Sequence, residues 1–234
     1  MTTFEIIPED LDLRGCSLIA GFHGIGATGY WTVKYMIQKL GAERVAFVDS
    51  EQAPPVAAYS GGKLVTPHEL YRTGNIAFLK IDVPVYRESE VAFYRALASW
   101  VARAGFVEAA LVGGLDAGLR VDRETHRLAH TSNFSPRGPL LQSKPLEDER
   151  IIVGPVAVLL NRFQMLGFPA CAILSYATTE RVDPRAASAA IEVLSGLYGV
   201  EVDTSSLIKG AEALEKETFK EEKPETERGG SMYT

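Results

Sequence analysis

The sequence predicts an α/β fold, a three-layer α/β/α sandwich around a mostly parallel sheet. Apolar runs of strand length alternate with segments of helical apolar spacing along most of the chain. Turn and helix-end signals separate them, such as Gly41 after one helical segment and Pro155 in the first turn of another. An apolar content of 46% in 234 residues is ample for a sizeable core. Together these features are typical of a sheet covered by helices on both faces.

The first half of the chain alternates strands with two helices. The expected elements are a strand over 17–22, a helix over 28–40, a strand over 44–49, short strands over 56–59 and 64–66, a strand over 76–83 and a helix over 88–103. The helix over 28–40 carries a broad apolar stripe. The two short strands flank Ser60-Gly61-Gly62-Lys63, a turn sequence that predicts a hairpin.

The second half continues the alternation after a less regular stretch. A buried strand is expected over 107–115, and the polar segment 116–150, which is rich in proline, predicts one antiparallel excursion and a long loop. Then follow a helix over 155–166, a strand over 170–176, a helix over 184–198 and a last helix from Thr204 onward. We therefore expect one α/β domain over 1–208 and a terminal helix with a flexible charged tail over 209–234.

Composition excludes several classes of function. The net charge of −6 and the lack of a basic block make nucleic acid an unexpected partner. No apolar run approaches the ~20 residues that cross a bilayer, and the N-terminus lacks the basic start of a signal peptide, so we expect a cytoplasmic protein with no membrane partner. Cys16 and Cys171 each begin an apolar run, which predicts small buried hydrophobic residues instead of a disulfide.

The motif that most suggests an enzyme is Gly24-Ile-Gly-Ala-Thr-Gly29. It follows a strand, opens a helix and is followed by Asp49 some 20 residues on, as in a dinucleotide-binding fingerprint. Two features weaken this interpretation: bulky Phe22-His23 precede the first glycine, and no second nucleotide-binding half follows. The alternative is that the glycines allow a strand and a helix to pack closely.

Other patterns do not combine into a catalytic or metal site. The chain has no G-x-S-x-G, G-x-x-x-x-G-K-[ST] or H-E-x-x-H motif. His126 and His130 are four residues apart without a carboxylate or cysteine at ligand spacing, so we expect solvent-exposed histidines. His23, His68, Asp49, Glu51 and Asp116 stand near strand ends, but the sequence does not establish that they meet. We expect no catalytic residue, metal or cofactor.

The end of the chain has an unusual composition. Residues 215–228 are almost entirely Glu, Lys, Thr and Pro, a composition that cannot repay the entropy of ordering, and Gly229-Gly230-Ser231 form a flexible joint. The last residues, Met232, Tyr233 and Thr234, read as hydrophobic-Tyr-X. An apolar residue followed by tyrosine arises there by chance with a probability of about 2% for this composition. These residues are therefore candidates for partner binding.

Several ordered motifs together resemble the proteasome assembly chaperone two family, in its archaeal branch. They are Leu18-Ile-Ala-Gly-Phe-His-Gly-Ile-Gly-Ala-Thr-Gly29, Val48-Asp-Ser-Glu51, Ala53-Pro-Pro55, Pro67-His-Glu-Leu-Tyr71, Leu111-Val-Gly-Gly-Leu115 and Asp183-Pro-Arg-Ala-Ala187. The resemblance covers about residues 18–207. It implies an α/β/α sandwich similar to the purine nucleoside phosphorylase-like fold, with a glycine-rich turn that has no established nucleotide role.

The resemblance also implies a non-enzymatic function. It identifies the chain as a chaperone that binds α subunits of the proteasome core particle and forms homo-oligomers, with Met232, Tyr233 and Thr234 matching the tail that docks between α subunits. Two alternatives stay open. One is a nucleotide-binding enzyme that uses the Gly24–Gly29 loop, and the other is a homo-oligomeric scaffold whose tail is incidental.

Overall fold

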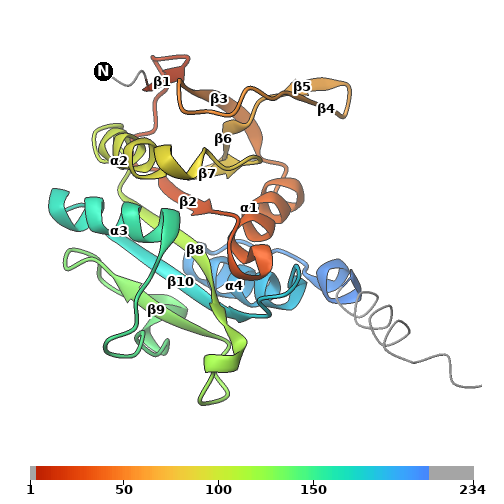
Figure 1. Cartoon of the computed structure of the whole chain (residues 1–234), viewed down its shortest axis with the longest axis vertical. Coiled ribbons are helices and arrows are strands. Elements are labelled where there is room, and N and C mark those ends of the chain that lie inside the picture. The colour runs from red at the N-terminus through yellow and green to blue at the C-terminus, as the bar shows by residue number, and fades with distance from the viewer. Residues whose placement is uncertain (1–3, 211–234) are drawn as a thin grey trace, which may run out of the picture.

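An eight-stranded sheet forms the centre of the molecule (Figure 1), and the computed structural model describes residues 4–210. The strands of this sheet are β1 (Phe4–Ile7), β2 (Ser17–Gly21), β3 (Glu43–Ser50), β6 (His68–Thr73), β7 (Ile76–Ile81), β8 (Glu108–Asp116), β9 (His126–His130) and β10 (Ala170–Ala177). Their spatial order is β1-β3-β6-β7-β2-β8-β10-β9. A separate hairpin of β4 (Ala58–Ser60) and β5 (Lys63–Val65) projects from the body.

The sheet is parallel at its centre and antiparallel toward both edges. β7, β2, β8 and β10 run in the same direction, and the remaining pairings, β1 with β3, β3 with β6, β6 with β7 and β9 with β10, are antiparallel. The α/β fold class is confirmed. The expectation of a mostly parallel sheet holds for these four central strands, and the flanking strands make the whole sheet mixed.

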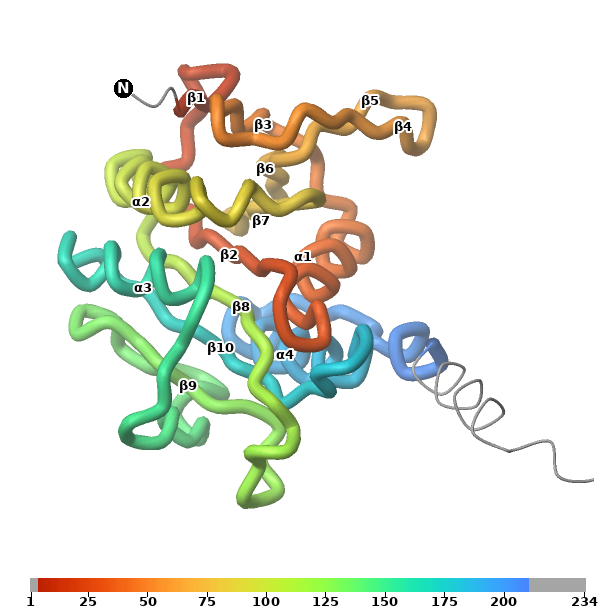
Figure 2. The backbone as a smooth tube through the Cα atoms, viewed as in Figure 1, coloured from red at the N-terminus to blue at the C-terminus, as the bar shows by residue number. Residues whose placement is uncertain are grey.

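Helices cover both faces of the sheet, which gives the expected three layers (Figure 2). The helices are α1 (Thr28–Lys39), α2 (Glu90–Val101), α3 (Gly154–Leu166) and α4 (Pro184–Tyr198), with short 3-10 turns η1 (Ile25–Ala27), η2 (Arg87–Ser89), η3 (Ala117–Leu119) and η4 (Gly138–Leu141). α1 packs beside α4 on one face, and α2 packs beside α3 on the other. Residues 205–210 are helical, in agreement with the last helix expected from Thr204.

Side chains alternate between the two cores because successive residues of a strand point to opposite faces. Ile19 of β2 and Val112 of β8 are buried in the core beneath α1 and α4. Leu18 and Leu111, their neighbours in the chain, are buried in the core beneath α2 and α3. The central strands are therefore apolar on both faces, as buried parallel strands are expected to be.

Two strands were missed by the sequence pattern, and one irregular region was predicted correctly. β1 and β6 have no counterpart among the expected elements. The antiparallel excursion within 116–150 is confirmed: β9 pairs with β10, and its outer side is covered where Leu128 N–H donates to the carbonyl of Lys144 at 2.9 Å. The expected hairpin is present, with both strands shifted by one or two residues.

The expectation for the two cysteines is confirmed, and no covalent link joins them. Cys16 and Cys171 are both free and fully buried, in opposite cores. Burial raises the pKa of the Cys171 thiol, so this side chain stays neutral. Among residues 4–210, no helix combines the length and apolarity that crossing a bilayer requires.

The start of α4 carries a cap whose loss has a predictable effect. The Asp183 carboxylate accepts from the amides of Arg185 (3.0 Å) and Ala186 (3.1 Å), and Pro184 occupies the first turn. The other carboxylate oxygen accepts from Thr178 N–H at 3.0 Å. We expect Asp183→Ala to lower the free energy of unfolding by about 1–2 kcal/mol, measured by urea denaturation. Asp183→Asn keeps a capping oxygen and should cost less than half as much; equal losses would contradict a capping role.

Candidate functional site

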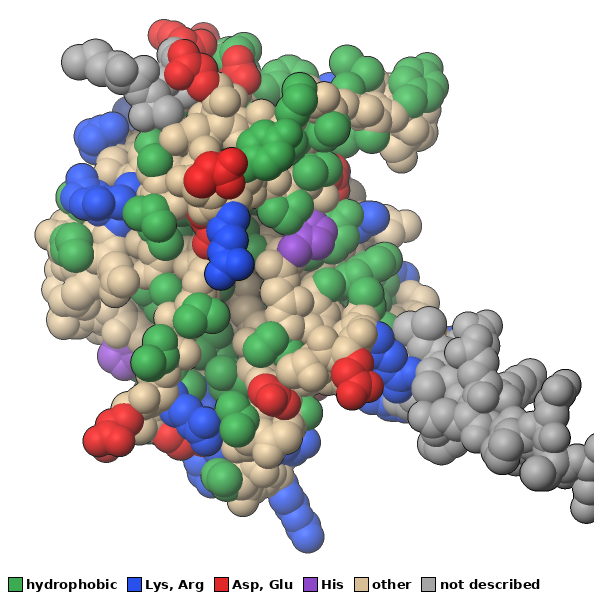
Figure 3. Space-filling view, viewed as in Figure 1, with side chains coloured by type: hydrophobic (Ala, Val, Ile, Leu, Met, Phe, Trp, Pro, Cys, Tyr) green, Lys and Arg blue, Asp and Glu red, His purple; other side chains and the backbone are tan. Residues whose placement is uncertain are grey.

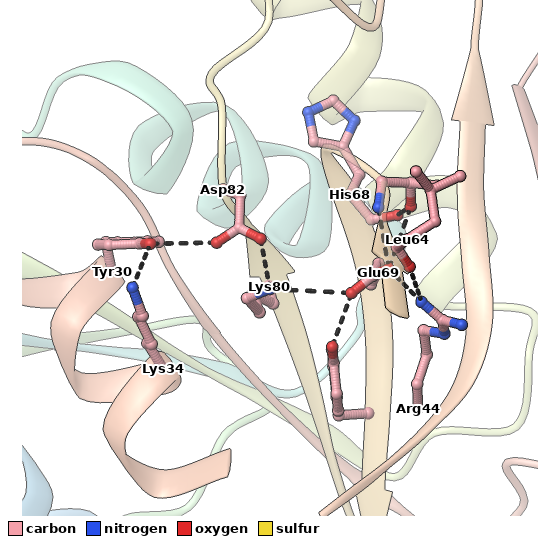
Figure 4. Close-up of polar contacts among 10 residues, drawn as sticks. Tyr30, Lys34, Arg44, Leu64, His68, Glu69, Lys80 and Asp82 are labelled. Atoms are coloured by element: carbon pink, nitrogen blue, oxygen red, sulfur yellow. Dashed lines mark hydrogen bonds and ion pairs between the residues drawn. The ribbon is translucent and has the colours of Figure 1, made fainter. Parts of the chain in front are cut away.

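The candidate tail residues Met232, Tyr233 and Thr234 lie outside the described residues. Within residues 4–210, a group of interacting polar side chains lies where the β4–β5 hairpin leaves the sheet (Figure 4). A cleft of about 990 Å³ separates this hairpin from α1. Its lining includes Tyr30 and Lys34 of α1, Tyr71 of β6, and Lys80 and Asp82 at the end of β7.

A fully buried carboxylate, Glu69, lies at the centre of these contacts (Figure 4). Its Oε1 accepts from Arg44 Nη1 at 2.7 Å and from Thr66 N–H at 3.0 Å, and its Oε2 accepts from the Tyr71 hydroxyl at 2.7 Å. Lys80 Nζ lies 3.8 Å from Oε2. Burial alone would raise the pKa of Glu69, but the bonds from Tyr71, Thr66 and Arg44 outweigh it and hold the pKa below its ordinary value. Glu69 is therefore a charged structural anchor.

Arg44 connects this anchor to the projecting hairpin. The same Nη1 that pairs with Glu69 also donates to the Leu64 carbonyl at 3.1 Å, and the guanidinium lies 4.4 Å from the centre of the Phe47 ring. Thr66, directly after β5, is held by Glu69. Contacts from β3 and β6 thus fix the base of the hairpin from two sides.

A second group of contacts joins α1 to the end of β7. The Tyr30 hydroxyl donates to Asp82 Oδ1 at 3.1 Å and accepts from Lys34 Nζ at 3.1 Å, while Lys80 Nζ donates to Asp82 Oδ2. Burial and the Asp82 charge raise the pKa of Tyr30 to about 12. The His23 ring stacks on Tyr30 with centroids 4.1 Å apart, and burial lowers its pKa. The charged groups at this end of the cleft are thus paired with one another.

On its other side, the hairpin borders an apolar groove of about 940 Å³. Ile7 of β1, Phe47 of β3 and Leu64 of β5 line it, together with the 53–57 segment. The hairpin thus borders both hollows, and Val56, Ala57 and Lys63 contribute to the lining of each. Exposed apolar surface of this kind on a projecting element is typical of protein interaction sites.

The Gly24–Gly29 turn is packed against backbone. A Cβ added at Gly29 would lie 2.3 Å from the Val112 carbonyl oxygen, and one added at Gly114 would lie 2.3 Å from the Ile25 carbonyl oxygen. Gly26 has a φ of 62°, and its carbonyl accepts from Asp183 N–H at 2.9 Å. The turn therefore occupies the space between β2 and β8, where an α/β sheet would place a ligand. The packing interpretation accounts for Gly26 and Gly29, whereas a Cβ added at Gly24 would meet no atom within 4 Å.

The acidic residue of the proposed fingerprint is also in the wrong place. Asp49 lies on β3, and two strands, β6 and β7, separate β3 from β2. At about 4.8 Å per strand, this puts β3 roughly 14 Å from β2. In a dinucleotide-binding fold the acidic residue instead follows the strand next to the glycine turn. The topology therefore does not support the nucleotide-binding alternative.

The histidines take separate structural positions. His126 Nε2 lies 2.7 Å from Ser143 Oγ, His130 Nδ1 lies 3.0 Å from the Thr131 carbonyl, and the fully buried His68 places Nε2 2.9 Å from the Val83 carbonyl. The expectation of solvent-exposed rings is wrong for His126, which is partly buried against Ser143. No group of three or more His, Cys, Asp or Glu side chains in residues 4–210 has metal-binding geometry.

Sequence reasoning missed Glu69 and Arg44 as the residues that hold the hairpin. His68, Glu69, Leu70 and Tyr71 do not alternate between polar and apolar residues, so β6 lacks the period-two pattern of a half-buried strand. The polar residues His68 and Glu69 are both buried, which a local pattern does not predict. A buried ion pair between β3 and β6 depends on the pairing of distant segments, which no local pattern shows.

Comparisons with known proteins agree with the fold. Residues 18–221 match the model of the PAC2 family. Pyrococcus furiosus PbaA, described as an archaeal homolog of proteasome-assembly chaperone, superposes with a TM-score of 0.78 at 20% identity, over 94% of this chain and 96% of that one. Pyrococcus furiosus PbaB, an archaeal proteasome activator, has a TM-score of 0.74 at 21% identity, over 95% and 99%.

A protein of unknown function from Thermoplasma acidophilum has a TM-score of 0.69 at 23% identity, over 89% of this chain and 87% of that one. Among curated proteins no sequence matches this chain. The family match spans most of the chain, from β2 through α4, and includes both the glycine turn and the hairpin. The chain belongs to the PAC2 family.

Proposed function

We propose that the protein is a cytoplasmic, non-enzymatic chaperone that assists assembly of the proteasome core particle by binding its α subunits as a homo-oligomer. The family match over residues 18–221 carries this proposal. It is supported by the names of two structural neighbours, a homolog of proteasome-assembly chaperone and a proteasome activator. The mutually satisfied charges of the cleft and the filled space between β2 and β8 favour a binding role over a catalytic one.

The proposed contact is made by the chain end. Met232 and the Tyr233 ring would enter a pocket between neighbouring α subunits and bury apolar surface, and the carboxylate of Thr234 would pair with a pocket lysine. The residues from Lys216 to Thr234 reach about 60 Å when fully extended. Several such tails on one oligomer raise the avidity by about 10²–10⁴ if they engage together.

Removing Met232, Tyr233 and Thr234 tests this contact. Full burial of one large apolar side chain is worth about 1.5–3 kcal/mol, and the truncation removes two such side chains, so we expect the truncated protein to bind α subunits at least ~100-fold more weakly. Pull-down and surface-immobilised binding of purified α subunits provide the measurement. Ser231→Ala, which alters only the preceding residue, is the matched control and should bind like the unaltered protein.

Circular dichroism and light scattering should show that the truncated protein keeps its fold and its oligomeric state. Unchanged capture of α subunits by the truncated protein would contradict tail docking. That result would favour the scaffold with an incidental tail, which predicts no loss of any partner on truncation.

A further inference from the structure

His68, the first residue of β6, is a buried histidine with one unused ring nitrogen. Its side chain is fully buried, and its ring centroid lies 5.1 Å from that of Phe93 on α2. Nε2 lies 2.9 Å from the Val83 carbonyl oxygen. A carbonyl oxygen can only accept, so Nε2 carries the proton and Nδ1 is the unprotonated nitrogen of a neutral ring. Nδ1 has no hydrogen-bond partner within residues 4–210, so the site suits the neutral ring alone.

The surroundings of the ring disfavour its charged form. A proton on Nδ1 would give a buried N–H without an acceptor and would place a positive charge beside Phe93. Tyr94 of α2, which contacts Phe93, is neutral because burial raises its pKa. Burial lowers the pKa of His68 below its ordinary value of 6.5 and outweighs the bond to Val83 and the charge of Asp82, which both act to raise it.

The acidic residues on the elements around the ring are directed elsewhere. The Asp82 carboxylate, at the end of β7, is bonded to side chains of α1 and β7. Glu69 follows His68 on β6, and successive residues of a strand point to opposite faces; Figure 4 shows the ring pointing away from this carboxylate. On α2, the Glu90 carboxylate lies near Gly154 of α3, where an added Cβ would be 3.7 Å from Oε1. A protonated His68 would therefore lack a paired carboxylate.

The bond from His68 holds one wall of the cleft between α1 and the hairpin. Asp82, Val83, Thr66 and Pro67 all line this cleft. The Asp82 amide donates to the Pro67 carbonyl at 2.8 Å, and the Thr66 hydroxyl donates to the His68 carbonyl at 3.3 Å. In Figure 3 the surface is hollowed below the projecting hairpin, at the right of the view, where the cleft lies. The buried His68 ring thus fixes this wall from the interior.

We propose that His68 is a pH-sensitive clip, which holds residues 82–86 against β6 while its ring is neutral and releases them when the ring is protonated. The charged ring reaches water only by leaving its buried position, and the Val83 carbonyl then loses its donor. Residues 82–86 belong to no helix or strand, so they move without breaking a sheet ladder. The cleft therefore opens at this wall in mildly acidic solution. The proposal does not depend on the tail or on the α subunits.

The sign and the pH range of the opening follow from proton linkage. In the open form the His68 ring is in water and binds a proton with its ordinary pKa of 6.5, whereas the closed form binds it more weakly. The stabilisation of the closed form is therefore complete above pH 6.5. As the pH falls further, opening increases by up to about tenfold per pH unit, until the lower pKa of the closed form is reached. The effect of Glu69 is separate, because it is confined to the range below pH 4.5.

Amide hydrogen exchange at pH 7.5 and 5.5, corrected for the intrinsic pH dependence of exchange, tests the clip. In the unaltered protein we expect the opening of residues 82–86 to increase about tenfold at pH 5.5, while β8 changes little. His68→Phe fills the same buried space without a titrating group and should abolish this increase. His130→Gln, which removes an exposed histidine on β9, is the matched control and should retain it.

Nuclear magnetic resonance of the His68 ring in the unaltered protein provides a measurement that requires no variant. We expect the neutral ring to carry its proton on Nε2 and to titrate with a midpoint below 6.5. A midpoint at or above 6.5 would overturn the clip. So would equal opening at the two pH values, an increase that persists in His68→Phe, or an equal increase in β8, which would indicate unfolding of the whole domain.

Discussion

Gly29→Ala is expected to lower the free energy of unfolding by roughly 3 kcal/mol, although alanine favours a helix by about 1 kcal/mol at an ordinary interior position. The added methyl would lie 2.3 Å from the Val112 carbonyl oxygen and 2.6 Å from the Phe22 amide nitrogen. Both obstacles are backbone atoms of the central sheet region, so neither can move aside as a flexible side chain would. Urea denaturation followed by circular dichroism measures the loss.

Gly24→Ala is the matched control from the same glycine motif. Gly24 has an extended backbone, and a Cβ added there meets no atom within 4 Å. We expect its free energy of unfolding to change by less than about 0.5 kcal/mol. The contrast between two glycines of one motif follows from packing alone.

Gly24→Ala and a further variant, Gly26→Val, test whether the glycine motif serves packing or binds a nucleotide. If the motif held a dinucleotide, the unaltered protein would bind NAD or ATP at equilibrium, and both Gly24→Ala and Gly26→Val would weaken that binding. A measured affinity that depends on Gly24 would contradict the packing interpretation.

The sequence predicted most of the buried elements because their signals are local. The strand at 170–176 begins with the continuous apolar run 170–174, and the helix at 184–198 begins at Asp183-Pro184, a recognisable start signal. The hairpin follows from Gly61-Gly62, whose backbone suits a two-residue turn. Each of these features depends on neighbours within a few residues along the chain.

What could not be predicted depends on contacts between distant segments. The order of the strands places β3 beside β1 and β6, which no local pattern specifies. The burial of Glu69 depends on Arg44 and Lys80, both more than ten residues away, and the sequence alone favours an exposed position for such a residue. Likewise, exposed Ile151 and Val153 resemble core residues in the sequence, and their exposure is visible only in the fold.

Replacing Glu69 with leucine is expected to lower the free energy of unfolding by about 3 kcal/mol or more. The change leaves Arg44 and Lys80, whose side chains are 29% and 12% exposed, without their buried partner, and it removes the acceptor of the Thr66 amide. Thermal and urea unfolding measure the loss. Glu43→Gln at the adjacent cleft, where no ion pair forms within residues 4–210, should change stability by less than about 0.5 kcal/mol.

The lowered pKa of Glu69 predicts that the free energy of unfolding decreases at low pH. Its pKa is lowered in the folded protein, so the unfolded chain binds the proton more tightly. The stabilisation that ionised Glu69 contributes to the folded protein is therefore complete above its ordinary pKa of 4.5. It is lost as the pH falls through the lower pKa that Glu69 has in the folded protein. Glu69→Gln should lack this component, so the difference in stability between the unaltered protein and the variant should shrink below pH 4.5. A constant difference across that range would contradict a charged Glu69.

The loss of Glu69 should also affect the β4–β5 hairpin. Without Glu69, Arg44 loses the partner that positions it on the Leu64 carbonyl, so the base of the hairpin is held less firmly. We expect amide hydrogen exchange to accelerate more in the hairpin than in β8 when Glu69 is replaced by Gln. Equal acceleration in the hairpin and in β8 would show that Glu69 stabilises the whole domain and does not specifically order the hairpin.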